Sequence, residues 1–217
     1  MLNQLLNKFE RKFGKFAIQN LMLYIIIGMG VFYAADVILK TNPDNNVYIL
    51  NMIYFDRERI LSGQVWRVLS FLFMPPDRRI LIVVFFLYFY WLMGVKIEER
   101  WGSFKFNVYY FISVLSCIIT GFSVGYATNV YLNLSVFLAF AVLFPEEQLY
   151  AFFVLPLKAK WLGIVDAIYL VYEYVKGGYY IRLFIIVSLV NFFIFFGKDF
   201  IQLMYYTGRR YYHKLKK

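Results

Sequence analysis

The residue types that carry out hydrolytic chemistry are scarce in this sequence. It has one histidine, His213, in a basic C-terminal stretch, and one cysteine, Cys117, in an apolar run. A serine hydroxyl becomes a useful nucleophile only when a neighbouring base accepts its proton. Ser135 lies within residues 106–145, a stretch without any charged residue or histidine. We therefore interpret Ser135 as a buried, backbone-bonded hydroxyl.

Patterns that would bind a metal or cofactor are also missing from the sequence. No group of His, Cys, Asp and Glu has the spacing of a metal site, and no glycine-rich loop is arranged to bind phosphate. We predict no metal and no cofactor. The net charge of +10 would indicate a nucleic-acid partner in a soluble protein. Because 62% of the residues are apolar, the basic loops of a membrane protein explain it better, and we predict no nucleic-acid partner.

The charge-free runs predict an all-α polytopic membrane protein with six transmembrane helices. A run of about 20 residues crosses the hydrocarbon core of about 30 Å. Two of the expected spans are short, about 24 Å and about 22 Å, which predicts local thinning of the bilayer. The expected spans are 16–35, 80–95, two within 106–145 around a turn at 121–133, one from 161 to about 173, and 183–197. We assign residues 17–204 to this membrane domain.

Basic segments flank the membrane domain at both ends. Residues 1–16 form an amphipathic segment that either lies on the membrane surface or simply fixes the orientation of the first span. Residues 205–217 form a basic tail. Lys and Arg are more numerous in the segments on the side of the two termini than in the opposite ones, so both termini are predicted to be cytoplasmic.

Two places within the membrane domain are unusual for an apolar chain. Trp66 and Arg67 lie in the long loop between the first two spans, which is too amphipathic to cross and is expected to be partly embedded in one leaflet. Asp166 lies in the fifth span, where an ionised carboxylate costs about 2.5 to 3.5 kcal/mol near the bilayer centre. It either binds a client or a proton, or lies nearer the interface, close to Trp161. Asn191 in the sixth span is expected to hydrogen-bond across helices.

Four short motifs in a fixed order resemble the rhomboid superfamily, which includes the non-proteolytic derlins. The resemblance covers roughly residues 62–163 and implies a six-helix bundle with a partly embedded first loop. It also implies that Gly94, Glu98, Trp101 and Gly102 hold the end of the second span. The motifs are Gly63-Gln64-Val65-Trp66-Arg67, residues 94–102 with Phe104-Lys105-Phe106, residues 139–145, and residues 156–161.

The same resemblance implies that the catalytic residues are missing. The family serine at the start of the fourth span falls near Val130, and the oxyanion-binding His and Asn of the second span fall near Ile82 and Phe86. His213 lies well beyond the sixth span, where the family carries its catalytic histidine. The resemblance therefore implies a rhomboid-like pseudoprotease without the Ser-His pair.

Three functions are compatible with these residues. The first is an inactive rhomboid-like protein of membrane protein quality control. It binds membrane lipids and transmembrane segments of client proteins through Trp66, Arg67, Asp166 and the gap between the second and fifth spans. The alternatives are an intramembrane serine protease that uses Ser135 and a small-solute or lipid transporter that uses Asp166. The Lys, Ile, Asn, Tyr and Phe bias favours a bacterial plasma membrane, although a derlin-type protein of the endoplasmic reticulum would look similar. The oligomeric state is left open.

Overall fold

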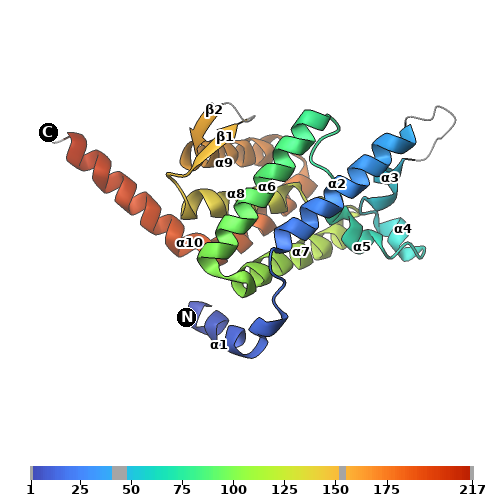
Figure 1. Cartoon of the computed structure of the whole chain (residues 1–217), viewed down its shortest axis with the longest axis horizontal. Coiled ribbons are helices and arrows are strands. Elements are labelled where there is room, and N and C mark those ends of the chain that lie inside the picture. Colours follow the sequence, from blue (N-terminus) through green and yellow to red (C-terminus); the bar gives the residue numbers. More distant parts are fainter. Residues whose placement is uncertain (1, 41–47, 152–154, 216–217) are drawn as a thin grey trace.

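The computed structural model describes residues 2–40, 48–151 and 155–215, and the chain within them is almost entirely helical (Figure 1). Residues 1, 41–47, 152–154 and 216–217 lie outside the described part, and with them fall part of the first loop and the last two residues of the predicted tail. The main helices are α1 (Leu2–Phe13), α2 (Leu21–Lys40), α6 (Ile80–Trp101), α7 (Ser103–Val124), α8 (Val130–Leu143), α9 (Ala159–Lys176) and α10 (Tyr179–Leu215).

Four of these helices, α2, α6, α7 and α10, are long and apolar enough to cross a membrane. The protein is therefore an integral, multi-pass membrane protein in character, as the composition indicates. Helix α8 is shorter, with 14 residues, and α9 carries charged side chains at Lys160, Asp166, Glu173 and Lys176. The count of six spans thus stays a prediction, although α8 and α9 both belong to the bundle.

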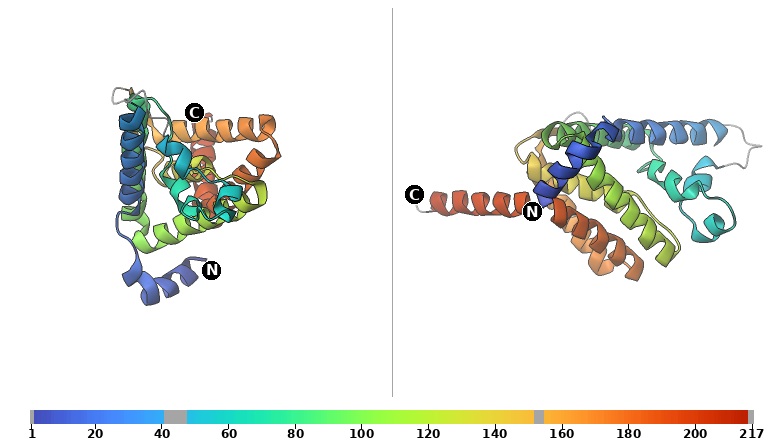
Figure 2. Two further views of the ribbon diagram at one scale, coloured as in Figure 1. Left: turned by 90° about the vertical axis from the view of Figure 1, so that its right-hand side faces the viewer. Right: turned by 90° about the horizontal axis from the view of Figure 1, so that it is seen from below.

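Two predicted spans are longer than the sequence indicated. Helix α6 has 22 residues instead of the 16 expected at 80–95, and the apolar part of α10 extends through Tyr179–Tyr206 rather than 183–197. The predicted tail at 205–217 begins inside α10, whose C-terminal half projects away from the bundle (Figure 2). The charge-free parts of these two helices are still 80–95 and 183–197, about 24 Å and about 22 Å long, so local bilayer thinning stays a prediction.

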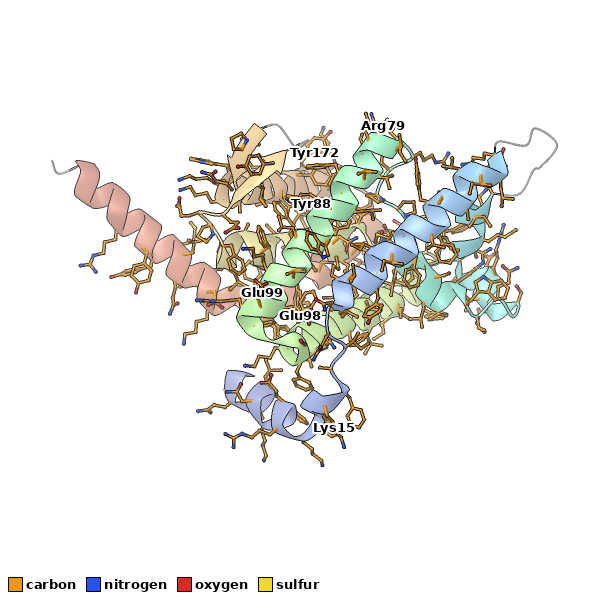
Figure 3. All side chains as sticks on the ribbon, viewed as in Figure 1. Lys15, Arg79, Tyr88, Glu98, Glu99 and Tyr172 are labelled. Atoms are coloured by element: carbon orange, nitrogen blue, oxygen red, sulfur yellow. The ribbon has the colours of Figure 1, made fainter. Side chains whose placement is uncertain are left out.

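The helices of the bundle run alternately in opposite directions. At one end, Glu98 of α6 accepts a hydrogen bond from the backbone of Asn20, just before α2. At the other end, the Tyr33 hydroxyl of α2 donates to the carbonyl of Arg78, just before α6. Figure 3 shows Arg79 and Glu98 at opposite ends of α6. Helix α1 and the C-terminal end of α10 lie on the Glu98 side (Figure 1).

A small β-hairpin, which the sequence did not indicate, connects α8 to α9. Strands β1 (Gln148–Ala151) and β2 (Leu155–Lys158) pair antiparallel, with Leu149 opposite Leu157. Leu149 is buried, and Glu146 just before β1 forms ion pairs with Lys158 and Lys160. The hairpin thus joins the end of α8 to the start of α9.

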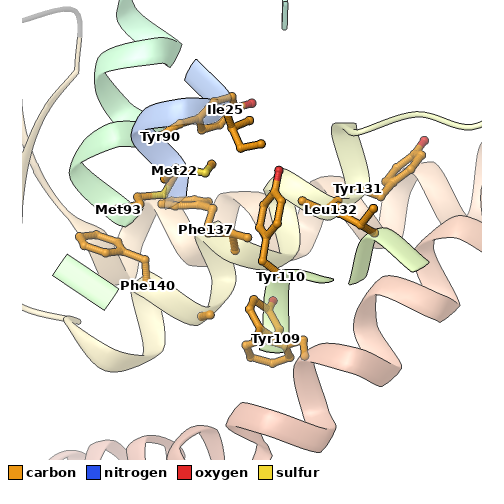
Figure 4. Close-up of a cluster of buried hydrophobic side chains, with 14 of the residues drawn as sticks. Met22, Ile25, Tyr90, Met93, Tyr109, Tyr110, Tyr131, Leu132, Phe137 and Phe140 are labelled. Carbon is orange, nitrogen blue, oxygen red and sulfur yellow. The ribbon is translucent and has the colours of Figure 1, made fainter. Parts of the chain in front are cut away.

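Helix α8 forms the centre of the bundle, because α6, α7, α9 and α10 all pack against it. Aromatic and aliphatic side chains fill the space around it (Figure 4). Small residues allow close approach between neighbouring helices. A Cβ on Gly94 would lie 2.3 Å from the Cβ of Met22 in α2, and one on Gly163 would lie 2.6 Å from the Cβ of Ala141 in α8.

Candidate functional site

Ser135, the serine nearest to the expected nucleophile position, is enclosed in the core of the bundle. It is 1% exposed, and its hydroxyl lies 2.6 Å from the hydroxyl of Tyr109 and 3.2 Å from the carbonyl oxygen of Ser188. A tyrosine with an ordinary pKa near 10 is a poor general base at neutral pH. In the described residues, no histidine, lysine or carboxylate hydrogen-bonds to Ser135. This geometry agrees with a structural hydroxyl that links α7, α8 and α10.

The positions that correspond to the rhomboid nucleophile and oxyanion-binding residues carry apolar side chains, and the structure places them at the start of α8 and in the first half of α6. Val130 is the first residue of α8, which is where the resemblance puts the nucleophile. Ile82 and Phe86 lie in the first half of α6 and are partly buried. Position 213 lies near the end of α10, beyond the bundle, and its side chain is outside the described part.

Arg67 is buried and organises the loop between α2 and α6. The loop contains the short helices α3 (Ile49–Ile53), α4 (Arg57–Leu61) and α5 (Arg67–Ser70), then a 3-10 turn at Phe71–Phe73. Arg67 is 2% exposed, donates to the carbonyls of Asn51 and Tyr54 at 3.1 and 2.9 Å and to the Gln64 side chain at 2.7 Å, and lies over the Tyr54 ring. Loss of solvent lowers its pKa, but the guanidinium stays charged because its ordinary pKa is above 12. Arg67 therefore fixes α5 against the end of α3.

Trp66 lies at the exposed surface of the loop that Arg67 fixes. Its ring is 55% exposed, and its indole N–H donates to the carbonyl of Met52. Leu61, Val65 and Leu69 are exposed beside it in the sequence. An apolar surface on a loop next to membrane-spanning helices suits the interfacial region of a bilayer.

Two polar side chains that the sequence interpretation missed attach this loop to the bundle. The side-chain amide of Asn129, just before α8, donates to the carbonyls of Leu72 and Met74 at 3.0 and 2.9 Å. The Arg57 guanidinium donates to the carbonyl of Phe122 at the end of α7. The position of Asn129 just before a helix indicates from the sequence that its side chain has a structural role. It does not identify the partners, which lie more than fifty positions away in the sequence.

The end of α6 is held by contacts from three directions. Glu98 accepts hydrogen bonds from the Asn20 backbone and the Ser103 hydroxyl. The ring of Trp101 lies 4.4 Å from that of Phe196 in α10. Gly102 has a φ of 85°, a left-handed conformation that ends α6 and turns the chain into α7. These contacts are internal, as are those of Gly94 with α2.

Four buried polar residues from four helices meet near the middle of the bundle, and we call them the Tyr90 cluster. Tyr90 of α6 hydrogen-bonds to the side-chain amide of Asn133 in α8, and Asp166 of α9 and Tyr110 of α7 lie near enough to Tyr90 for electrostatic interaction without a hydrogen bond. All four are at most 9% exposed. Asp166 is therefore enclosed by the bundle rather than exposed on its surface. Figure 4 shows Tyr90 and Tyr110 between the apolar side chains of neighbouring helices.

Helix α9 leaves space on both of its flanks. It packs mainly against α8 and α10 rather than against α6, so the predicted gap between the second and fifth spans corresponds to a weakly packed boundary. On its other side, α8, α9 and α10 line an open apolar groove of about 1590 Å³. Ile164, Ile168, Ile186 and Phe193 contribute to its walls.

Asn191 hydrogen-bonds across helices, as predicted, through its amide to the Ser113 hydroxyl and the Tyr109 carbonyl of α7. Cys117 is buried and unpaired. Within residues 2–40, 48–151 and 155–215, no group of three or more His, Cys, Asp and Glu side chains is arranged to hold a metal ion.

Comparison with known proteins finds a distant similarity to a rhomboid protein. The chain is 33% identical over 114 residues to Rhomboid-like protease 1 of Toxoplasma gondii, a match that covers 49% of this chain and 36% of that protein. The chain thus matches little more than a third of the length of this relative. No family model matches the sequence. The similarity agrees with the resemblance read from the motifs, at the level of the rhomboid superfamily.

Proposed function

We propose that this protein is a rhomboid-like membrane protein that does not cleave peptide bonds and instead binds transmembrane segments of other membrane proteins. The observation that carries the first half of the proposal is the environment of Ser135. Its hydroxyl is closed in by Tyr109 and the Ser188 carbonyl, and none of its described partners is a base. Acyl transfer also needs preorganised donors for the oxyanion, and Ile82 and Phe86 have none.

The support for client binding comes from the surfaces beside α6 and α9. The weak packing between these helices leaves a lateral route towards the Tyr90 cluster, and the exposed Trp66 belongs to the loop just before α6. Bilayer thinning around the short charge-free parts of α6 and α10 is a separate expectation, and we restrict the proposal to binding. Effects on the folding, transport or degradation of the bound protein would follow from this binding.

Cleavage tests separate this proposal from the protease alternative. The purified protein and the Ser135→Ala variant are incubated in detergent with a model transmembrane substrate, with an active rhomboid protease as the positive control. We expect no product from either. Cleavage by the unmodified chain that disappears in Ser135→Ala would establish a working protease and overturn the proposal.

Photo-crosslinking tests the binding half. A photoreactive residue is placed at Trp66 or at Val165, an exposed position of α9, with Ile119, an exposed position of α7, as the matched control. We expect membrane-protein adducts from the first two positions and mainly lipid adducts from Ile119. Recovery of lipid alone from all three positions would contradict client binding.

The transporter alternative is favoured by one observation, the burial of Asp166 without a hydrogen-bond partner among the described residues. A carrier that uses this carboxylate would lose uptake in Asp166→Asn while it kept its fold. Uptake of a solute by proteoliposomes, abolished in this variant, would move the assignment from binding to transport.

A further inference from the structure

The Tyr90 cluster contains buried polar atoms that the described part of the protein leaves without a hydrogen-bond partner. Both carboxylate oxygens of Asp166, the amide oxygen of Asn133 and the hydroxyl of Tyr110 are buried and lack a hydrogen-bond partner among the described residues. An unpaired polar atom in a membrane interior is costly, and an unpaired charge costs more. Asp166 is the most incompletely paired member, because neither of its carboxylate oxygens accepts a hydrogen bond from the described residues.

The cluster lies near the middle of the length of α6. Tyr90 is ten residues from the start of α6, which has 22 residues, so it is about 15 Å from that end and about equally far from the other. Its neighbours reach it from α7, α8 and α9, and none of them is a lysine or arginine. A cationic partner for the Asp166 carboxylate would therefore have to come from outside these helices.

The cluster is buried, and the boundary between α6 and α9 is the weakly packed side of its enclosure. Ala159, Gly163, Asp166 and Leu170 are the buried residues of α9, spaced three or four apart, so they form the stripe that faces α8. Asp166 interacts across to Tyr90 of α6, although α9 and α6 pack only weakly. A helix that entered between α6 and α9 would meet the Asp166 carboxylate first.

We infer that the Tyr90 cluster selects transmembrane segments that carry a hydrogen-bond donor at their middle, a lysine or arginine first and a glutamine or asparagine second. This inference rests on the proposed client binding and names the chemistry of the client. Such a segment is poorly stable alone in a bilayer, because its polar side chain has no partner there. The Asp166 carboxylate supplies that partner, and the client supplies the missing donor.

The test compares model transmembrane peptides that differ at one central position. Leucine-rich helices with Leu, Lys, Gln or Glu at the centre carry a photoactivatable leucine next to it and compete for the full-length protein in nanodiscs. An interhelical hydrogen bond in membranes is worth about 1 to 2 kcal/mol, so we expect Lys to be enriched over Leu about tenfold, with Gln intermediate and Glu below Leu. Adducts should map to α6 and α9.

Two variants of Asp166 test whether the preference for the Lys peptide over the Leu peptide depends on the Tyr90 cluster. Asp166→Asn should reduce the enrichment of Lys over Leu to near one while the Leu peptide is still captured, and Asp166→Glu should restore part of it. Asp199→Asn, which changes an acid of α10 outside the cluster, is the matched control and should leave the enrichment unchanged. The peptide series on the unmodified chain keeps the test decisive even where a variant fails to fold.

The outcomes separate the two claims. Equal capture of the Lys and Leu peptides by the unmodified chain, or a Lys preference that persists in Asp166→Asn, would overturn the donor-selection inference and leave client binding intact. Failure to capture any of the four peptides would overturn the proposed function and the inference together.

Discussion

Arg67 shows how one side chain determines the shape of a whole loop. It is a planar donor in a place where three acceptors from Asn51, Tyr54 and Gln64 converge, and it is almost inaccessible to solvent. A lysine keeps the charge but lacks the fork of N–H groups. The loop geometry therefore depends on the guanidinium group and not only on a positive charge.

We expect Arg67→Ala to lower the free energy of unfolding by about 2 to 4 kcal/mol, because buried carbonyls lose their donor, and Arg67→Lys to lower it by about half as much. Tryptophan fluorescence during thermal unfolding in detergent measures both. Arg59→Ala is the control, since Arg59 is half exposed and its ion pair with Asp56 and its contact with the Tyr54 ring lie at the surface, and it should change little. Equal effects from Arg59 and Arg67 would contradict this account.

At the residue scale, the sequence predicted some partners and missed others. The absence of a base near Ser135 and the interhelical role of Asn191 follow from residue type and spacing, because an apolar span offers few alternatives. The roles of Asn129 and of Tyr90 with Asn133 depend on residues far away in the sequence. A polar residue in a span indicates that a partner exists, but only the packing of several helices decides which residue it is.

The contact between α2 and α6 depends on the absence of a side chain at Gly94. A Cβ there would lie 2.3 Å from the Cβ of Met22, whereas one on Gly30 would lie 3.8 Å from the nearest side-chain atom, on Leu87. We expect Gly94→Ala to destabilise the protein by about 1 to 3 kcal/mol through overpacking. Gly30→Ala should be neutral or stabilise it by up to about 1 kcal/mol, because alanine favours helix. Thermal unfolding in detergent compares the pair, and a similar shift for both would exclude the close-packing explanation.

The β-hairpin element is tied to the membrane domain by charge. Lys158 and Lys160 donate to the Glu146 carboxylate and lower its pKa from 4.5 to about 2. Because the pKa in the folded protein is the lower one, the ion pairs are fully formed above pH 4.5 and are lost as the pH falls towards 2. We expect carbon-13 NMR, with the signal assigned by Glu146→Gln, to follow this titration. The double variant Lys158→Gln/Lys160→Gln should return the pKa to the ordinary range, and an unchanged value would contradict the pairing.

Element boundaries were the least predictable feature, for a physical reason. The charges from Lys96 to Arg100 mark where the membrane ends, but they do not end the helix, since Glu98 finds donors on neighbouring segments and α6 continues to Gly102. The same holds for α10, which continues past the apolar region. The hairpin was missed because its two strands are four residues long each, and a short apolar run does not distinguish strand from loop.

At the scale of the whole molecule, the basic N-terminal helix and the projecting end of α10 both leave the bundle at the end of α6 that carries Glu98 and Trp101, because Asn20 bonds to Glu98 and Phe196 of α10 packs against Trp101. Helix α1 attaches there through the buried Leu6 and an ion pair between Glu10 and Lys105, while Leu5, Phe9 and Phe13 stay exposed. This leaves an apolar face with flanking lysines, which suits the surface of an anionic leaflet. The positive-inside rule then predicts that this side is cytoplasmic.

Cysteine labelling of intact cells tests this orientation with little background, because the native Cys117 is 1% exposed. Lys15 and Glu99 lie at the end of the molecule that carries α1, and Arg79 lies at the opposite end of α6 (Figure 3). In a bacterial host, a membrane-impermeant maleimide should label Arg79→Cys in intact cells and should label Lys15→Cys and Glu99→Cys only after the membrane is permeabilised. Labelling of Lys15→Cys and Arg79→Cys from the same side would contradict the arrangement of the bundle itself. The reverse pattern would keep the arrangement and show that the chain is inserted in the opposite sense, against its distribution of lysine and arginine.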